Sequence, residues 1–194
     1  MGLMAQFTRT AIVNSFIRLL NEKPLDKITV KDIVDDCGVN RNTFYYHFQD
    51  IYALLDELFR TELQKILKED GAAGSWQEAL LVCTEFAREN KRAVYHVYQS
   101  GARDYLEDYM RRLMEKMMEA FVRREAQGMD LPEEDILVVA AFYQAALNGM
   151  VLEWLRRDMK EDPERIIHKI GVLFDGTVKY ALLNSAKAQG RGAL

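Results

Sequence analysis

The sequence predicts an all-α fold. Hydrophobic residues recur every three or four positions along much of the chain, which is the spacing that gathers them on one face of an α-helix. The chain has only three prolines and contains long stretches without turn-forming residues, which favours helices almost throughout. Hydrophobic residues make up 49% of the chain and charged residues 29%, which is the balance of a soluble globular protein.

About nine helices are expected, and local capping signals mark the first of them. The first helix ends before the turn around Pro24. Thr29 can cap the second helix, with Asp32 as the acidic partner of a capping box. Gly38 can end that helix in a left-handed conformation, and Asn40 can cap the third helix. The expected helices cover residues 4–21, 30–37, 41–48, 51–67, 75–89, 91–99, 103–127, 133–157 and 163–186.

The tight turn at Gly38 joins the second and third helices in a helix-turn-helix arrangement. This pair belongs to a three-helix core that the long fourth helix closes. The second helix of such a motif can enter the major groove of DNA. The sequence therefore predicts a helix-turn-helix DNA-binding domain over residues 1–54, followed by a separate helical domain over residues 55–194.

Residues 29–48 resemble the DNA-binding domain of the TetR family of transcriptional regulators. The family pattern is Thr-x-x-x-Ile, then Ala-Gly-Val-Ser-x-x-Thr-Leu-Tyr-x-His-Phe, and the resemblance extends over about residues 6–55. This chain has Cys37 in place of alanine, Asn40 in place of serine, and Ile51 where relatives usually carry lysine. The resemblance implies a TetR-like fold whose second domain binds an effector and forms dimers.

Five residues at the starts of the second and third helices are candidates for DNA contact. Arg41 can donate to guanine or to a phosphate, Asn42 can pair with adenine or bind the backbone, and the Thr43 methyl group can meet a thymine methyl group. Thr29 and Lys31 lie at the start of the second helix, where exposed N–H groups also favour a phosphate. We therefore expect three base-reading residues and two phosphate-binding residues.

Three aromatic residues of the third helix complete the predicted DNA-binding set. The family resemblance implies that Tyr45, Tyr46 and His47 pack on or hydrogen-bond the sugar-phosphate backbone, which positions a protein without reading the sequence. Either tyrosine ring could instead cover the small core. Residues 1–54 carry six basic and six acidic side chains, and Ile51 removes one usual phosphate contact, so we expect modest affinity for each half-site.

The second domain is rich in aromatic residues and methionine. Their simplest interpretation is core packing, but the family resemblance implies a ligand pocket among the helices equivalent to residues 68–155. An unidentified small molecule is the expected effector. The polar candidates for contact with it are Tyr98, Tyr105, Tyr109 and Asn148.

Broad apolar stripes along the last two predicted helices can serve both an internal core and a partner helix. The family resemblance implies a homodimer held by a bundle of two helices from each protomer. Such a dimer places its reading helices about one duplex turn, ~34 Å, apart, which favours an inverted-repeat operator in double-stranded DNA. The candidate interface residues are Tyr143, Leu147, Met150, Trp154, Ile170, Phe174 and Val178.

Together these features predict a ligand-responsive transcriptional regulator. Repression is the common outcome in the TetR family and is the favoured expectation. The second hypothesis is an activator controlled by a protein partner, because Gln49–Tyr52 and Tyr95–Ser100 loosely resemble a TetR-like subgroup that includes an activator of dihydroxyacetone kinase genes.

Other classes of function lack a matching motif. The sequence shows no paired carboxylates in a pocket-like context, no nucleophile motif and no phosphate-cradling loop, so neither enzymatic activity nor a cofactor is expected. Cys37 and Cys83 match no metal or redox spacing, and no metal site is expected. No run approaches the ~20 apolar residues of a membrane span and no signal peptide is evident, so we expect a cytoplasmic protein without a membrane partner.

Overall fold

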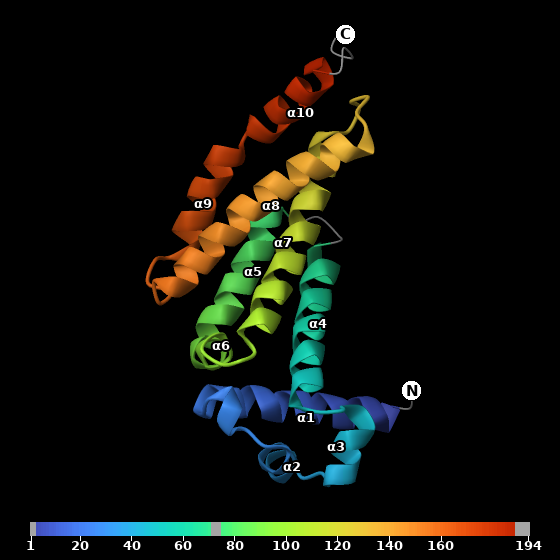
Figure 1. Ribbon diagram of the computed structural model, residues 1–194, viewed down its shortest axis with the longest axis vertical. Coiled ribbons are helices and arrows are strands. Elements are labelled where there is room, and N and C mark those ends of the chain that lie inside the picture. The colour runs from blue at the N-terminus through green and yellow to red at the C-terminus, as the bar shows by residue number, and fades with distance from the viewer. Residues whose placement is uncertain (1–2, 71–74, 189–194) are drawn as a thin grey trace. The chain divides into compact units, whose positions relative to one another are not determined.

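The computed structural model describes the backbone of residues 3–70 and 75–188 and confirms the all-α fold. Within these residues the chain forms ten α-helices, one 3-10 helix and no strand (Figure 1). The elements are α1 (Leu3–Glu22), η1 (Leu25–Lys27), α2 (Val30–Cys37), α3 (Arg41–His47), α4 (Ile51–Asp70), α5 (Trp76–Glu89), α6 (Lys91–Tyr98), α7 (Arg103–Glu125), α8 (Glu133–Arg156), α9 (Pro163–Phe174) and α10 (Thr177–Ala188).

The last helix of the prediction is two helices in the structure. The sequence predicts one helix over residues 163–186, whereas α9 ends at Phe174 and α10 begins at Thr177. Between them Asp175 has an extended ψ of 117°, and Gly176 has a φ of 72°, in the left-handed region that glycine adopts at little cost. The prediction was wrong here because an isolated glycine in an apolar helical pattern does not reveal whether it continues or breaks the helix.

Packing divides the chain into two compact units. The first comprises residues 1–65 and 86–109, and the second comprises residues 66–85 and 110–194. Helix α6 therefore belongs with the N-terminal helices, and it packs directly against α1. The end of the DNA-binding domain at residue 54 stays a prediction, because compactness groups residues by packing and not by function.

The core of the first unit is built from side chains of α1 to α4. Ile12, Phe16, Ile33, Phe44 and Leu54 are all completely buried. Each such side chain contributes about 1.5–3 kcal/mol to folding by leaving water. The short helices α2 and α3 are thus held by apolar anchors on the inner side, which leaves their outer faces free for polar residues.

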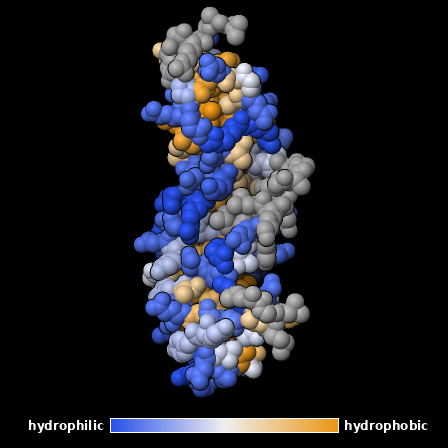
Figure 2. Space-filling model, turned by 90° about the vertical axis from the view of Figure 1, so that its right-hand side faces the viewer, coloured by the Kyte–Doolittle hydropathy of each residue, from blue (hydrophilic) through white to orange (hydrophobic). Residues whose placement is uncertain are grey.

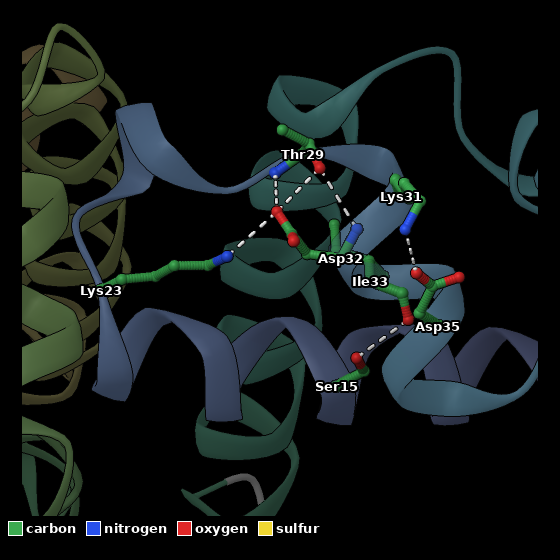
Figure 3. Close-up of polar contacts among 7 residues, drawn as sticks. All are labelled: Ser15, Lys23, Thr29, Lys31, Asp32, Ile33 and Asp35. Carbon is green, nitrogen blue, oxygen red and sulfur yellow. Dashed lines mark hydrogen bonds and ion pairs between the residues drawn. The ribbon is translucent and has the colours of Figure 1, made fainter.

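Polar contacts tie α1 to its neighbours in the same unit. The buried Ser15 hydroxyl donates to the Ile33 carbonyl at 3.2 Å, which links α1 to α2 (Figure 3). On α6, the Ala93 backbone N–H donates to the Asn21 side-chain oxygen at 3.3 Å. The His96 Nδ1 atom lies 2.6 Å from the Leu20 carbonyl oxygen. Because a carbonyl oxygen only accepts, Nδ1 must carry the proton in this contact.

The second unit packs helices α8, α9 and α10 with most of α5 and α7. Leu113, Met118 and Leu147 are among its completely or almost completely buried side chains. The Trp76 and Phe174 ring centroids lie 5.3 Å apart, which brings the start of α5 against the end of α9. Helix α10 contacts both α8 and α9.

Helix α8 is unusually apolar for its length. An 18-residue window within Glu133–Arg156 has a mean hydropathy of 1.6, so by length and composition alone this helix could cross a membrane, and 17% of the window is buried. The expectation that no stretch approaches that length is corrected here. On the face drawn in Figure 2, hydrophobic side chains reach the surface mainly at the upper end, where Figure 1 places α10 and the α7–α8 turn.

Candidate nucleic-acid interface

A capping box fixes the first turn of α2. The Asp32 backbone N–H donates to the Thr29 hydroxyl at 3.2 Å, and the Thr29 backbone N–H donates to the Asp32 carboxylate at 2.8 Å (Figure 3). Lys23 adds an ion pair with the same carboxylate at 3.0 Å. These hydrogen bonds from Thr29 and Lys23 lower the pKa of Asp32 to about 2. The predicted capping box is confirmed.

The turn after α2 sets the start of α3. Gly38 has a φ of 71°, and its N–H donates to the Val34 carbonyl. Asn40 then caps α3, because its side-chain oxygen accepts from the Thr43 backbone N–H at 2.8 Å and from the Thr43 hydroxyl at 3.0 Å. Both predicted caps are confirmed. The Thr43 hydroxyl is engaged by the cap, so the methyl group is the part of that side chain left for a base.

Helix α3 separates a buried side from an exposed side. Phe44 is completely buried and Phe48, which follows the helix, is 4% exposed. Arg41 and Asn42 are exposed, as are Tyr45 and Tyr46 at 56% and 78%. Residues four positions apart lie on the same face of a helix, so the pairs 41/45 and 42/46 form one continuous outer surface. The structure leaves both tyrosine rings in solvent rather than over the core.

The remaining predicted DNA-binding residues flank this surface. Thr29 and Lys31 are exposed, whereas Thr43 and His47 are half-buried at the edge of α3. The rings of His47 and Tyr46 meet edge to face with centroids 5.1 Å apart. The first unit therefore carries all eight predicted residues on α3 and on the first turn of α2.

Most cations of residues 1–54 already have an acidic partner within the chain. Lys31 pairs with Asp35 at 2.8 Å, and this contact raises the pKa of Lys31 through its hydrogen bond and charge (Figure 3). The other pairs are Arg9 with Glu57, Arg18 with Asp36, and Lys23 with Asp32. Among the described residues of this region, Arg41 and Lys27 have no ion-pair partner. Within the described ranges, Arg41 is thus the cation without an ion-pair partner on the outer surface of α3.

The three tyrosines predicted to meet an effector each have a partner of their own in the first unit. The Tyr98 ring lies under the Arg103 guanidinium at 4.4 Å. Tyr105 stacks on an aromatic ring of α4 at 5.7 Å, and Tyr109 stacks on another at 4.7 Å. Asn148 belongs to the second unit, where its buried side-chain oxygen has no hydrogen-bond partner among the described residues.

Each unit contains a hollow that the sequence did not predict. In the first, an apolar cavity of about 40 Å³ lies between α1, α4 and α6 and is not lined by the three tyrosines. In the second, Trp76, Phe121 and Phe174 line a groove of about 490 Å³ between α5, α7 and α9. No sequence signal could have found either, because the lining residues are distant in the chain.

The predicted interface residues lie mostly inside a single chain. Tyr143, Leu147, Trp154, Ile170, Phe174 and Val178 are each at most 8% exposed, whereas Met150 is 41% exposed. The same helices present a different apolar set to solvent, which the sequence did not predict. These exposed residues are Leu137, Val138, Phe142, Val172, Leu173, Tyr180 and Leu183.

Two family models match this chain. The model for bacterial regulatory proteins of the tetR family matches residues 12–58, and the model for a transcriptional regulator C-terminal region matches residues 74–176. The first match includes α2 and α3 in full, with every candidate DNA-binding residue. The second spans more than half of the chain.

Individual relatives that match this chain are also transcriptional regulators. The HTH-type dhaKLM operon transcriptional activator DhaS of Lactococcus lactis subsp. lactis (strain IL1403) is 27% identical over 84 residues, 43% of this chain and 45% of that protein. The class D tetracycline repressor of Escherichia coli is 30% identical over 105 residues, 53% of this chain and 46% of the repressor. The chain thus spans about half the length of these curated relatives.

Solved structures share the fold. The dihydroxyacetone kinase operon activator DhaS matches with a TM-score of 0.74 at 19% identity, covering 89% of this chain and 97% of that one. A TetR transcriptional regulator from Streptococcus agalactiae 2603V matches with a TM-score of 0.61 at 26% identity, covering 86% and 92%. From these matches and the two family models, the chain belongs to the TetR family of bacterial transcriptional regulators.

Proposed function

We propose that this regulator binds an inverted-repeat operator as a homodimer and represses transcription until an effector binds. The observation that carries the proposal is the outer surface of α3, where Arg41, Asn42, Tyr45 and Tyr46 are exposed while Phe44 anchors the helix from behind. TetR-family regulators act by binding DNA and are not enzymes. They are in general soluble proteins of the cytoplasm, and we propose the same location for this chain.

The proposed DNA-binding residues of α3 and of the first turn of α2 make two kinds of contact with DNA. Arg41, Asn42 and Thr43 read base edges in the major groove, because they occupy the first turn of α3 and offer a donor fork, an amide and a methyl group. The sugar-phosphate backbone is held on either side by Thr29, Tyr45, Tyr46 and His47, and Lys31 is the candidate for a further phosphate contact. The uncompensated charge of Arg41 makes it the main electrostatic contact with a base or phosphate.

A second copy of this chain covers the exposed apolar face of α8, α9 and α10. Val138 and Phe142 on α8 are 63% and 70% exposed, and Val172 and Leu173 on α9 are each 64% exposed. Leaving such residues in water is unfavourable, whereas an isologous dimer buries the same face on both protomers. Met150 is the one predicted interface residue that lies exposed on the same helix as Phe142.

Effector binding in the second domain shifts the population between two spacings of the reading helices. The unpaired Asn148 oxygen supports a ligand contact there, because a buried acceptor gains stability from any donor that reaches it. Tyr98, Tyr105 and Tyr109 stay proposed contacts.

A second candidate function is activation under the control of a protein partner. The resemblance to DhaS, which is named as a transcriptional activator, favours it. A reporter gene placed behind the bound operator separates the two functions, because repression lowers its expression when the regulator is present and activation raises it.

Selection of bound sequences from random DNA tests the proposed operator. The wild type should enrich an inverted repeat whose half-sites lie about 34 Å apart. Arg41→Ala should cost ~1–3 kcal/mol and relax the preference at one position of each half-site. Arg92→Ala, an exposed arginine of α6, is the matched control and should select the same repeat as the wild type. A folded wild type that enriches no repeat would contradict the proposal.

A further inference from the structure

The ion pair between Lys31 and Asp35 lies beside the proposed DNA-binding surface. Its Nζ and carboxylate oxygen are 2.8 Å apart, and the two side chains are 67% and 61% exposed (Figure 3). Lys31 lies in the first turn of α2, and Arg41 begins α3, the next helix of the helix-turn-helix. An exposed lysine at this place would meet a DNA phosphate if it had no internal partner.

Helix stability does not account for this pair. Lys31 is the second residue of α2, at the end of the helix where the backbone dipole disfavours a cation. Asp35 lies toward the other end, where the dipole disfavours an anion. The lysine also precedes the acid, which is the weaker order for pairs four residues apart. Exposed pairs of this kind contribute little to stability in any case.

Asp35 differs from the other two carboxylates of α2. Asp32 closes the capping box, and Asp36 pairs with Arg18 of α1, so both hold the fold. The only partner recorded for Asp35 in the described part of the chain is Lys31. Its removal should therefore leave the helix-turn-helix intact.

We propose that Asp35 serves as an internal substitute for a DNA phosphate, which occupies Lys31 and lowers the affinity of this regulator for every DNA sequence alike. The proposal rests on the proposed DNA-binding function. A phosphate that approaches Lys31 competes with Asp35 for the ammonium group and is repelled by the Asp35 carboxylate. The base contacts of α3 do not involve Lys31 or Asp35. They therefore supply a larger share of the binding free energy than they would if Lys31 were free to bind a phosphate. Such a device keeps non-specific binding weak.

Salt dependence measures this effect directly. Each phosphate neutralised by a protein cation steepens the fall of log K with log salt by ~0.9. In Asp35→Asn the freed Lys31 should add one such contact, on the selected operator and on random duplex DNA alike. The gain in affinity over wild type should therefore be about threefold larger at 50 mM than at 200 mM salt. The ratio of operator to random binding should stay unchanged.

Two controls separate the internal pair from a simple change of net charge. Glu89→Gln removes one exposed acid of the same unit, at the end of α5, and should leave the salt slope unchanged. Lys31→Met should leave the wild-type slope unchanged, because Asp35 already occupies Lys31 there, and adding Asp35→Asn to Lys31→Met should bring none of the steepening. Circular dichroism and melting temperature verify that each variant is folded.

The outcomes distinguish this inference from the proposed function. If the wild type binds the operator but Asp35→Asn keeps the wild-type slope, or steepens it equally with and without Lys31, the inference fails and the proposed function stands. If the folded wild type binds neither the operator nor random duplex DNA, the proposed function itself fails.

Discussion

Asp32 makes the stability of the first unit depend on pH. Its pKa is about 2 instead of the usual 3.8, because Thr29 and Lys23 stabilise the charged carboxylate. A carboxylate with a lowered pKa stabilises the folded state above its unfolded pKa, and that contribution is lost as the pH falls toward the folded value. Asp32→Asn should therefore be less stable than wild type at pH 7, and the difference should shrink between about pH 4 and pH 2.

Urea unfolding at a series of pH values measures this difference. Thr29→Ala is the matched background, because it removes the hydroxyl partner and should itself cost about 1 kcal/mol as the loss of an N-cap. In the Thr29→Ala background, Asp32→Asn should lower the free energy of unfolding by less than it does in the wild type. The effects of substitutions at two contacting residues are not additive. A difference between wild type and Asp32→Asn that is constant across this pH range would contradict the assignment.

At the scale of helices, local chemistry explains which parts of the site could be predicted. The caps at Thr29 and Asn40 and the turn at Gly38 depend on atoms within a few residues, so the sequence was sufficient to place α2 and α3. The exposed side of α8 was not predictable in this way. Leu147 and Phe142 are both apolar, yet the first is completely buried and the second 70% exposed. A helix that is apolar on several sides does not show which side faces its own core.

The break between α9 and α10 depends on one glycine. Gly176 has a φ of 72° with open space around its Cα, so backbone conformation alone opposes a side chain there. Gly176→Ala should destabilise the folded state by about 1–2 kcal/mol, because an L-residue in the left-handed region is strained. Gly149→Ala on α8 is the control, since it also meets no neighbour but is helical, and it should stabilise by ~0.5–1 kcal/mol.

Thermal unfolding of both variants checks this prediction. If Gly176→Ala were as stable as Gly149→Ala, the segment would form one continuous helix, as the sequence analysis expected. Circular dichroism would then show a gain of helix in Gly176→Ala.

At the scale of the whole molecule, the grouping of α6 with α1 was beyond sequence reasoning. The contact joins Asn21 to Asn90, whose side chains hydrogen-bond at 3.1 Å although 69 positions separate them in the chain. Neither residue belongs to a motif, and periodicity describes one helix at a time. Long-range partners of this kind require the fold itself. The first family match ends at residue 58, so α6 brings residues of the second matched region against α1, part of which belongs to the first.

The dimer proposal depends on the exposed face of α8, and Phe142 tests it. Phe142→Glu places an unpaired charge in the proposed apolar contact, which should cost about 3 kcal/mol or more and weaken the dimer roughly a hundredfold. Analytical ultracentrifugation should find a folded monomer with reduced operator affinity, because one half-site contact replaces two. Phe7→Glu, at a residue of α1 that is 67% exposed, should stay dimeric. If the Phe142→Glu protein remains a dimer at micromolar concentration, the subunit contact does not use this face of α8 and the proposal is wrong.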